Sequence, residues 1–263
     1  MTDSTPAPSM PDEPVELARL VAALERPLLL ALDCDGVLAP LTDHADDSIL
    51  TSGLGPDLAR LADVDGVTVA ILSGRSLDGL AQFEFDAAIQ VWGSYGAEQR
   101  GVAQPELTAE ESERLDVLDE LVSEAARRAG TGAWVERKPT SVVVHVREAD
   151  RDLSDAALDW ARTEQGRLVG HAVHEGSNVL ELMTRPADKG TGLDALRKEI
   201  DPASSVYVGD DVPDEDAFAR LGPGDVAIKI GPGDTLAGHR LADPDAMRSM
   251  IRALVDSLDP PTT

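Results

Sequence analysis

The chain has 263 residues, of which 42% are hydrophobic, and it carries a formal net charge of −26 with a sequence pI near 4.3. So acidic a surface repels the phosphates of nucleic acids and anionic lipids, which disfavours nucleic-acid and membrane partners. The hydrophobic residues are spread along the chain, and no run approaches the ~20 apolar residues that a bilayer span requires. We therefore expect a soluble protein of one large domain or two modest ones.

The first residues, 1–14, lack the basic start and apolar stretch of a secretory signal, and we expect them to form a disordered tail. The only cysteine, Cys34, has no partner for an internal disulfide, which fits a reducing compartment. We accordingly expect a cytoplasmic protein. The sequence does not specify an oligomeric state and is compatible with a monomer.

Apolar runs rich in Val, Ile and Leu recur along both ends of the chain and are typical of strands buried on both faces. They lie at residues 28–32, 67–72, 89–92, 206–208 and 226–230. Helical patterns are predicted at residues 15–25, 56–62, 193–200, 214–221 and 245–257. This alternation predicts an α/β fold with a doubly wound, mainly parallel sheet.

The middle of the chain has a different pattern. A long amphipathic helix is predicted over 111–129, a β-branched strand over 141–146 and a second helix over 154–165, with further strands at 167–171 and 178–182. We therefore expect an α+β cap domain at 99–185, inserted into a core formed by residues 15–98 and 186–258.

Two carboxylates follow the first apolar strand. Asp33 and Asp35 are spaced one residue apart, and Gly36 permits a sharp turn directly after them. Ligands of open α/β sheets bind at the carboxyl ends of strands, so chemistry is expected here. A turn and helix cap made by Asp and Gly would explain the same residues equally well.

The second strand delivers Ser73, Gly74 and Arg75 to the same edge of the sheet. A hydroxyl and backbone N–H groups at that place can hydrogen-bond phosphate oxygens. The alternative is an ordinary helix N-cap by Ser73 or Ser76.

Two further segments could complete a phosphate site. Lys189 stands just ahead of a helix predicted to begin at residue 190 or 191, where its ammonium could neutralise a phosphate oxygen or simply be solvated. Five carboxylates follow the fourth strand within residues 210–216 and repel one another unless a cation compensates. Such hard oxygen ligands favour Mg²⁺. Asp214 and Glu215 could instead favour the N-terminus of the next helix through its dipole.

The four segments together, in this order, indicate a phosphate site more specifically than any one of them does. The chain resembles the haloacid dehalogenase superfamily of phosphatases and, within it, the trehalose-6-phosphate phosphatases. The resemblance extends from about Leu28 to Leu254. Its motifs are LDCDGVLAP at 32–40, ILSGRS at 71–76, GSYGAE at 93–98, residues 136–147, NVLELMTRPADKG at 178–190, VGDDVPDEDAF at 208–218 and residues 231–244.

The resemblance implies a Mg²⁺-dependent phosphatase that forms an aspartyl-phosphate. Asp33 would be the nucleophile and Asp35 the general acid and base. The metal would be bound by Asp33, the backbone carbonyl of Asp35 and Asp210, supported by Asp211 and Asp214 directly or through water.

The phosphoryl oxygens would be held by polar groups that follow the second strand and begin a later helix. These are Ser73, Gly74, Arg75 and Lys189.

Substrate choice is expected to lie in the cap. Ser141, His145 and Arg147 would share one face of a strand by its period of two, with Lys138 beside them. Glu181, on a later strand, could accept hydrogen bonds from sugar hydroxyls. The alternation around these residues is also typical of a half-exposed strand without a ligand.

Three positions depart from the family pattern. Val37 and Pro213 stand where threonine is common, and Tyr95 stands where histidine is frequent. The implied substrate is trehalose 6-phosphate. Alternatives with the same core motifs are phosphatases of sucrose phosphate or mannosyl-phosphoglycerate, a phosphoglucomutase-type transferase, and a non-catalytic domain that binds sugar phosphates.

Overall fold

The computed structural model describes residues 10–42, 44–104, 106–176 and 178–259 and divides the chain into two compact units. The core unit contains the described residues up to Ala103 and from Asp188 onward, and the cap unit spans Gln104–Ala187. Residues 99–103, which we had assigned to the cap, belong to the core unit because Glu98–Gln99 pairs with the core sheet as its last strand.

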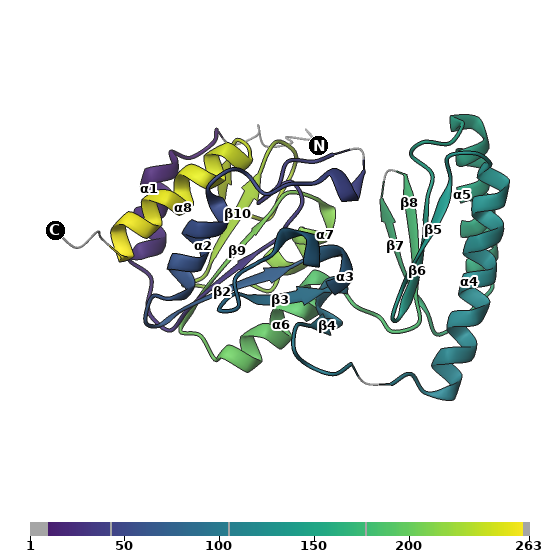
Figure 1. Ribbon diagram of the computed structural model, residues 1–263, viewed down its shortest axis with the longest axis horizontal. Coiled ribbons are helices and arrows are strands. Elements are labelled where there is room, and N and C mark those ends of the chain that lie inside the picture. The colour runs from purple at the N-terminus through teal and green to yellow at the C-terminus, as the bar shows by residue number, and fades with distance from the viewer. Residues whose placement is uncertain (1–9, 43, 105, 177, 260–263) are drawn as a thin grey trace, which may run out of the picture. The chain divides into compact units, whose positions relative to one another are not determined.

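The core unit is built on a seven-stranded sheet of order β11-β10-β9-β1-β2-β3-β4. Figure 1 labels β10, β9, β2, β3 and β4 of this sheet. All neighbours pair in parallel except β3 and β4. Every residue of β1 is buried, as expected for a central strand covered on both faces. The strands are β1 (Leu28–Leu32), β2 (Val67–Leu72), β3 (Gln90–Gly93), β4 (Glu98–Gln99), β9 (Ser204–Gly209), β10 (Val226–Ile230) and β11 (His239–Leu241).

Helices cover both faces of this sheet. Leu28, Leu30 and Leu32 pack in one apolar cluster with α1 (Pro14–Ala22), α2 (Leu54–Ala62) and α8 (Pro244–Leu258). Leu29 and Ala31 face the other cluster, with α6 (Lys189–Ile200) and α7 (Val212–Phe218). Side chains alternate between the faces of a strand, so the predicted doubly wound fold is confirmed. Short helical segments are η1 (Ala45–Asp47), α3 (Leu77–Leu80), η2 (Ala81–Phe83) and η3 (Ser94–Gly96).

The cap unit is a four-stranded antiparallel sheet of order β5-β6-β8-β7 with two helices on one face. Val142 and Val144 point to those helices and pack against Leu118 and Leu158. The intervening residues of β6 therefore point to the opposite face. The elements are α4 (Ala109–Ala129), β5 (Trp134–Lys138), β6 (Ser141–His145), α5 (Arg151–Gln165), β7 (Ala172–Gly176) and β8 (Val179–Met183).

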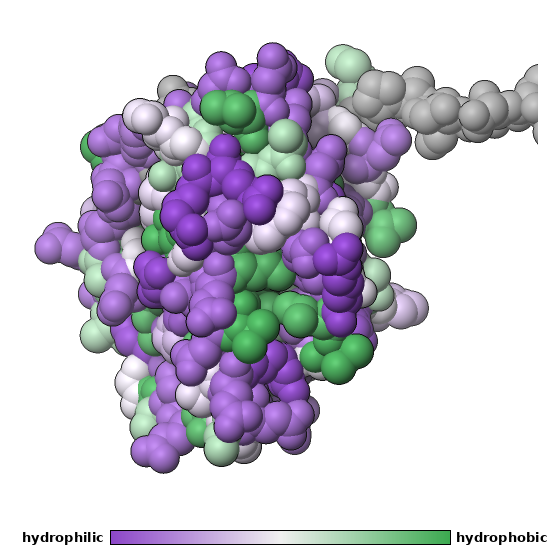
Figure 2. Space-filling view, turned by 90° about the vertical axis from the view of Figure 1, so that its right-hand side faces the viewer, coloured by the Kyte–Doolittle hydropathy of each residue, from purple (hydrophilic) through white to green (hydrophobic). Residues whose placement is uncertain are grey.

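The outer face of the cap helices, seen in Figure 2, is hydrophilic with apolar side chains among the charges. Val117 of α4 and Leu153 of α5 are exposed. Among the described residues, no helix combines the length and apolar character that a membrane span needs.

Several predicted elements are corrected. The strand expected at 167–171 is wrong, because this segment is a loop that contains Gly170 at φ +78° and the strand begins only at Ala172. The strand β5 was not predicted. Helix α6 begins at Lys189 and α7 at Val212, each one or two residues earlier than expected, since Asp188 and Asp211 are their N-caps.

The N-terminal tail was expected to be disordered over residues 1–14, and this is wrong for its last part. Pro14 begins α1, and the backbone N–H of Asp12 donates to the carbonyl oxygen of Arg240 at 2.7 Å. Residues 1–9 lie outside the described residues.

Candidate active site

Three adjacent parallel strands, β9, β1 and β2, end at the same edge of the core sheet. Asp33 follows β1, Ser73 follows β2 and Asp210 follows β9. The N–H of Asp33 donates to the carbonyl oxygen of Val208 at 2.9 Å, and that of Ser73 to Trp92 at 3.0 Å, which continues the ladder beyond the strands. Parallel pairing thus brings together residues that are 40 to 177 positions apart from each other in the sequence.

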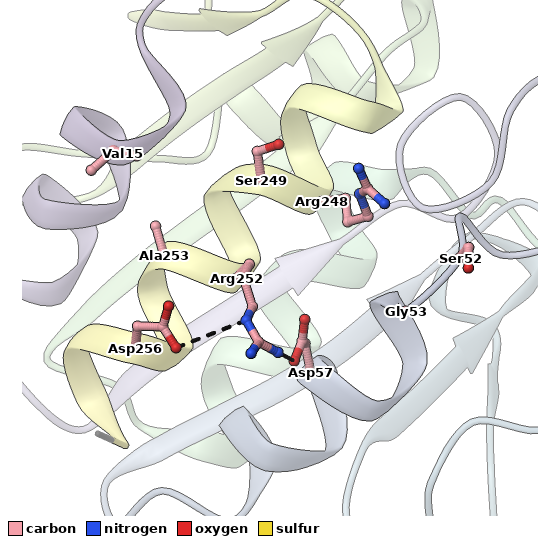
Figure 3. A pocket seen from close by; sticks show the side chains of 9 residues that line it. All are labelled: Val15, Ser52, Gly53, Asp57, Arg248, Ser249, Arg252, Ala253 and Asp256. Atoms are coloured by element: carbon pink, nitrogen blue, oxygen red, sulfur yellow. Dashed lines mark hydrogen bonds and ion pairs between the residues drawn. The ribbon is translucent and has the colours of Figure 1, made fainter. Parts of the chain in front are cut away.

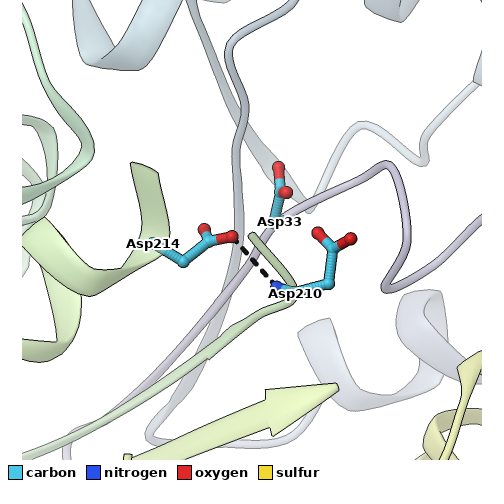
Figure 4. A group of neighbouring side chains, drawn as sticks. All are labelled: Asp33, Asp210 and Asp214. Atoms are coloured by element: carbon cyan, nitrogen blue, oxygen red, sulfur yellow. Dashed lines mark hydrogen bonds between the residues drawn. The ribbon is translucent and has the colours of Figure 1, made fainter. Parts of the chain in front are cut away.

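A cluster of three carboxylates forms the centre of this edge (Figure 4). Asp33, Asp210 and Asp214 each offer an oxygen within 4.8 Å of the others. The Lys189 ammonium lies 2.8 Å from Asp33 Oδ2 and 2.6 Å from Asp214 Oδ1. A second ammonium, that of Lys229, donates to the backbone carbonyl of Asp210. Three carboxylates therefore face two cations, which leaves excess negative charge at this point.

The pKa values at this cluster reflect that excess. Burial raises the pKa of Asp33 well above its ordinary value, and the charges of Asp214 and Asp210 add to the effect against Lys189. Burial and the charge of Asp214 raise the pKa of Asp210 to about 7. Burial disfavours the Lys189 ammonium, but Asp214 and Asp33 outweigh it and raise its pKa. A bound cation would relieve the same repulsion, so the donor set fits a hard divalent metal.

Asp214 differs from its two neighbours because protein donors occupy both of its oxygens. Its Oδ1 accepts from Lys189 at 2.6 Å and from the Tyr207 hydroxyl at 2.7 Å, and its Oδ2 accepts from the N–H groups of Asp210 and Asp211 at 2.9 Å each. The side chain is fully buried. Asp214 is therefore suited to fixing Lys189 and the loop of Asp210, whereas Asp33 and Asp210 are better placed to bind a metal.

Two glycines let the acidic loops come this close. A Cβ on Gly36 would lie 2.0 Å from Oδ2 of Asp210, and a Cβ on Gly209 would lie 2.2 Å from Cγ of Asp214. Gly36 also has φ +72°, so the turn after Asp35 is of the kind that its sequence predicts.

Asp35 is held by Arg75 instead of by the cluster. The Arg75 guanidinium donates from Nε to Asp35 Oδ2 and from NH2 to Oδ1, both at 2.6 Å, and Ser48 Oγ donates to Oδ1 at 3.3 Å. Such a forked pair fixes the orientation of a carboxylate. Arg75 was predicted to bind phosphate, and here its guanidinium contacts the predicted acid and base.

The remaining residues of the two loops have local roles. Ser73 Oγ accepts from the N–H of Arg75 at 3.2 Å, while Ser76 is the residue that caps the following helix. Asp211 is the exposed N-cap of α7 and lies outside the carboxylate cluster.

Two buried residues of this site were missed by the sequence analysis. Tyr207, on β9, donates to Asp214, and Lys229, on β10, donates to the backbone carbonyl of Asp210. Their side chains point to the site because of where they fall in the strands. Their spacing from Asp210 carried no motif that could have identified them.

The cap unit gathers most of its predicted residues on the sheet face opposite its helices. Lys138 Nζ lies 3.0 and 3.1 Å from the two oxygens of Glu181, and Ser141 Oγ donates to Oε1 at 2.6 Å. His145 lies on the same face and its Nε2 is 2.9 Å from Glu136.

Arg147 does not share that strand face. Strand β6 ends at His145, and Arg147 lies in the exposed turn that follows. The period of two therefore stops before this residue, and the prediction of its position is wrong. Trp134, which was not predicted, stacks on the His145 ring with centroids 3.9 Å apart.

A surface pocket of about 460 Å³ lies elsewhere on the core unit (Figure 3) and contains none of these groups. Arg252 spans it and pairs with Asp57 at 2.8 Å and Asp256 at 3.8 Å, so its charge is already neutralised. We therefore assign the chemistry to the carboxylate cluster.

Comparison with known families matches most of the chain. The model of the trehalose-phosphatase family matches residues 31–240, which include Asp33, Ser73, Lys189 and Asp210. The chain belongs to the trehalose-phosphatase family. Members of this family are phosphoric monoester hydrolases, and the chain is an enzyme of that class.

Among curated relatives, a probable trehalose-phosphate phosphatase C of Arabidopsis thaliana is 30% identical and covers 87% of this chain and 77% of its own length. The trehalose-6-phosphate phosphatase of Escherichia coli is 29% identical over 86% of both chains.

Solved structures support the fold of this trehalose-phosphatase family member. A trehalose-6-phosphate phosphatase related protein superposes with a TM-score of 0.69 at 25% identity, over 85% of this chain and 95% of its own. The C-terminal domain of the Candida albicans trehalose-6-phosphate phosphatase has a TM-score of 0.78 at 19% identity, over 95% of this chain and 99% of its own. A haloacid dehalogenase-like hydrolase of Bacillus subtilis has a TM-score of 0.59 at 17% identity, over 85% of this chain and 98% of its own. The predicted haloacid dehalogenase fold is thereby confirmed.

Proposed function

We propose that this chain hydrolyses trehalose 6-phosphate to trehalose and phosphate, with Mg²⁺ as its cofactor and an aspartyl-phosphate on Asp33 as its intermediate. The observation that carries the proposal is the buried Asp33 carboxylate, which lies between the Lys189 ammonium and Asp210 at the carboxyl edge of the sheet. The two curated relatives described above are named as phosphatases of trehalose phosphate and of trehalose 6-phosphate, which supports the same substrate here.

The metal would be held by Asp33, Asp210 and the backbone carbonyl of Asp35. Asp214 and Asp211 would act through the loop, Asp214 by its hydrogen bonds to the N–H groups of Asp210 and Asp211. When bound, Mg²⁺ would offset the negative charges of the nucleophile and the phosphate dianion. The raised pKa values of Asp33 and Asp210 support this assignment. They arise first from burial and then from neighbouring carboxylates, and a bound cation would stabilise the ionised form against both.

In the first step an Asp33 oxygen forms a bond to phosphorus and the bond from phosphorus to the sugar oxygen breaks. Asp35 gives its proton to that oxygen. In the second step Asp35 takes a proton from water, the water oxygen bonds to phosphorus, and the carboxylate of Asp33 leaves. Lys189 touches Asp33 at 2.8 Å and is placed to neutralise charge on the phosphoryl group.

The phosphoryl oxygens would also be bound by loop 73–75, that is Ser73, Gly74 and Arg75. Arg75 donates two hydrogen bonds to Asp35, so binding phosphate would require it to share its donors or to turn. The loop therefore links phosphate binding to the orientation of the acid and base.

The sugar would be recognised by the polar face of the cap sheet. Lys138, Ser141 and Glu181 form a hydrogen-bonded group there, and His145 lies on the same face. Carboxylate, ammonium and hydroxyl groups together suit a ligand with many hydroxyls. Arg147, in the turn after β6, is the fifth candidate and lies at the end of that strand.

A phosphate-release screen tests the proposal. Purified protein is assayed with and without Mg²⁺ against trehalose 6-phosphate, sucrose 6-phosphate, mannosyl-phosphoglycerate and glucose 6-phosphate. We expect trehalose 6-phosphate to give the highest kcat/KM, and only with the metal. Equal phosphate release from glucose 6-phosphate would refute the substrate, and an isomerised product without free phosphate would refute hydrolysis.

A further inference from the structure

The turn that follows β3 has an unusual backbone. Ser94 and Tyr95 have φ values of 48° and 59°, in the left-handed region that residues with a Cβ rarely occupy. Two consecutive residues of this kind persist only where the surroundings determine the conformation. Such backbone strain is common at functional sites, so the contacts of this turn are informative.

The Tyr95 ring lies directly against Gly74. A Cβ on Gly74 would meet Cε1, Cζ and Oη of Tyr95 at 2.8, 2.9 and 3.0 Å. The φ of Gly74 is outside the left-handed region, so its backbone would accept another residue. Glycine is therefore needed at this position for the ring to approach the middle of loop 73–75.

Backbone hydrogen bonds fix the same two segments to each other. The N–H of Tyr95 donates to the carbonyl oxygen of Ser73 at 2.9 Å, and the N–H of Ser94 donates to that of Arg75 at 2.7 Å. The Ser94 hydroxyl donates to the buried carboxylate of Glu98, which holds the turn from its other side.

The turn also packs against the helix that carries Lys189. A Cβ on Gly192 would lie 2.5 Å from the carbonyl oxygen of Tyr95, and a Cβ on Gly96 would lie 2.5 Å from the Cα of Gly192. The turn thus lies between loop 73–75 and α6, both of which supply groups to the phosphoryl site. Neither contact has room for a side chain.

We infer that Tyr95 is a positioning residue for the phosphoryl-binding loop: its ring and its N–H hold Gly74 and Ser73 in the conformation that receives the phosphoryl group. The inference rests on the proposed role of loop 73–75. The ring acts by packing, and Tyr95 is not required to touch the sugar. Its effect should therefore be the same for substrates with and without a sugar.

A double-mutant cycle between Gly74 and Tyr95 tests the inference. Tyr95→Ala keeps the backbone strain of a residue with a Cβ but removes the ring, and we expect kcat/KM to fall about tenfold. Gly74→Ala forces a methyl group into the ring and should cost at least as much. In the double variant the methyl group occupies the space that the ring has left. The fold-loss in kcat/KM of the double variant should therefore be well below the product of the two single fold-losses.

The cycle is measured with trehalose 6-phosphate and with p-nitrophenyl phosphate, which has no sugar. Tyr95→Phe should restore kcat/KM to within about twofold of the unmodified protein, because it keeps the ring. Gly79→Ala is the matched control, since its Cβ would meet nothing closer than Ser76 Oγ at 3.5 Å, an ordinary contact. Thermal unfolding of each variant reports whether it is folded.

Three results would overturn the inference. These are additive effects of Gly74→Ala and Tyr95→Ala, a loss confined to the sugar phosphate, and a Tyr95→Phe variant as impaired as Tyr95→Ala. If trehalose 6-phosphate is not hydrolysed but p-nitrophenyl phosphate is, the proposed substrate is wrong, and the double-mutant cycle is measured with p-nitrophenyl phosphate alone. If neither substrate reacts, the affinity for orthophosphate with Mg²⁺, measured by calorimetry, gives the same comparison. Equal affinities of the unmodified protein, the two single variants and the double variant would contradict the inference.

Discussion

Asp33 occupies a position that disfavours its own charge. It is buried, it faces two other carboxylates, and its pKa is raised despite the contact with Lys189. The negative charge that Asp33 would need as the proposed nucleophile therefore lowers the stability of the folded protein. This is the trade between activity and stability expected of a residue that reacts.

The substitution Asp33→Asn should separate these two effects. Turnover should fall by about three orders of magnitude or more, because an amide cannot form the acyl phosphate. The midpoint of thermal unfolding without metal should stay equal or rise, since a buried charge in a repulsive cluster is removed. Phosphate release and calorimetry measure the two effects. Asp63→Asn, at an exposed position, is the control, and activity retained by Asp33→Asn would exclude Asp33 as the nucleophile.

At the scale of helices and strands, the core was predictable and the cap only in part. Strands such as Leu28–Leu32 and Val67–Leu72 are continuous apolar runs because both of their faces are buried, and their bounds match the prediction. The strand β5 was missed because Glu136, Arg137 and Lys138 give an edge strand a charged sequence. Its pairing with β6, which sequence periodicity does not report, stabilises it.

The site was predictable where it depends on strand ends and unpredictable where it depends on packing. Asp33, Ser73 and Asp210 follow strands, so their meeting could be inferred from a parallel sheet. The pairing of Arg75 with Asp35 depends on side-chain direction across two loops. The hydrogen bond from Tyr207 to Asp214 depends on the strand register, and nothing in the local pattern specifies either contact.

The cap sheet contains a buried ion pair whose loss should be costly. Lys138 and Glu181 are almost fully buried, at 6% and 4% side-chain exposure. Glu181→Gln removes the negative charge that faces the Lys138 ammonium, so the free energy of unfolding of the cap should fall by about 3–5 kcal/mol. Denaturant unfolding of the full chain, with hydrogen exchange at β6 and β8 to identify the cap, measures this loss.

Glu175→Gln on β7 is the matched control for that experiment. Glu175 pairs with Arg162 at 3.0 Å, but both side chains are exposed, at 45% and 39%. Surface pairs of this kind contribute less than about 1 kcal/mol. Equal losses in the two variants would contradict an electrostatic role of the buried pair.

The molecule as a whole carries an excess of negative charge, and the site concentrates it. The net charge of −26 leaves few cations to neutralise the carboxylates at the sheet edge, where Lys189 lies within ion-pair distance of two of them. A metal bound there would therefore act on the stability of the core as well as on its chemistry.

This predicts an unusual dependence of stability on pH in the metal-free protein. The folded-state pKa of Asp210 is about 7 against an ordinary value of 3.8, so the folded protein binds more protons than the unfolded chain between these pH values. Stability that is present at low pH in this window is lost as the pH rises toward 7. The unfolding midpoint in chelator should thus fall from pH 5 to pH 7.5, and Mg²⁺ should raise it more at pH 7.5 than at pH 5. Asp210→Asn, which cannot titrate, should flatten both trends, whereas a midpoint that rises over this range in chelator would show that the cluster is not repulsive when it is empty.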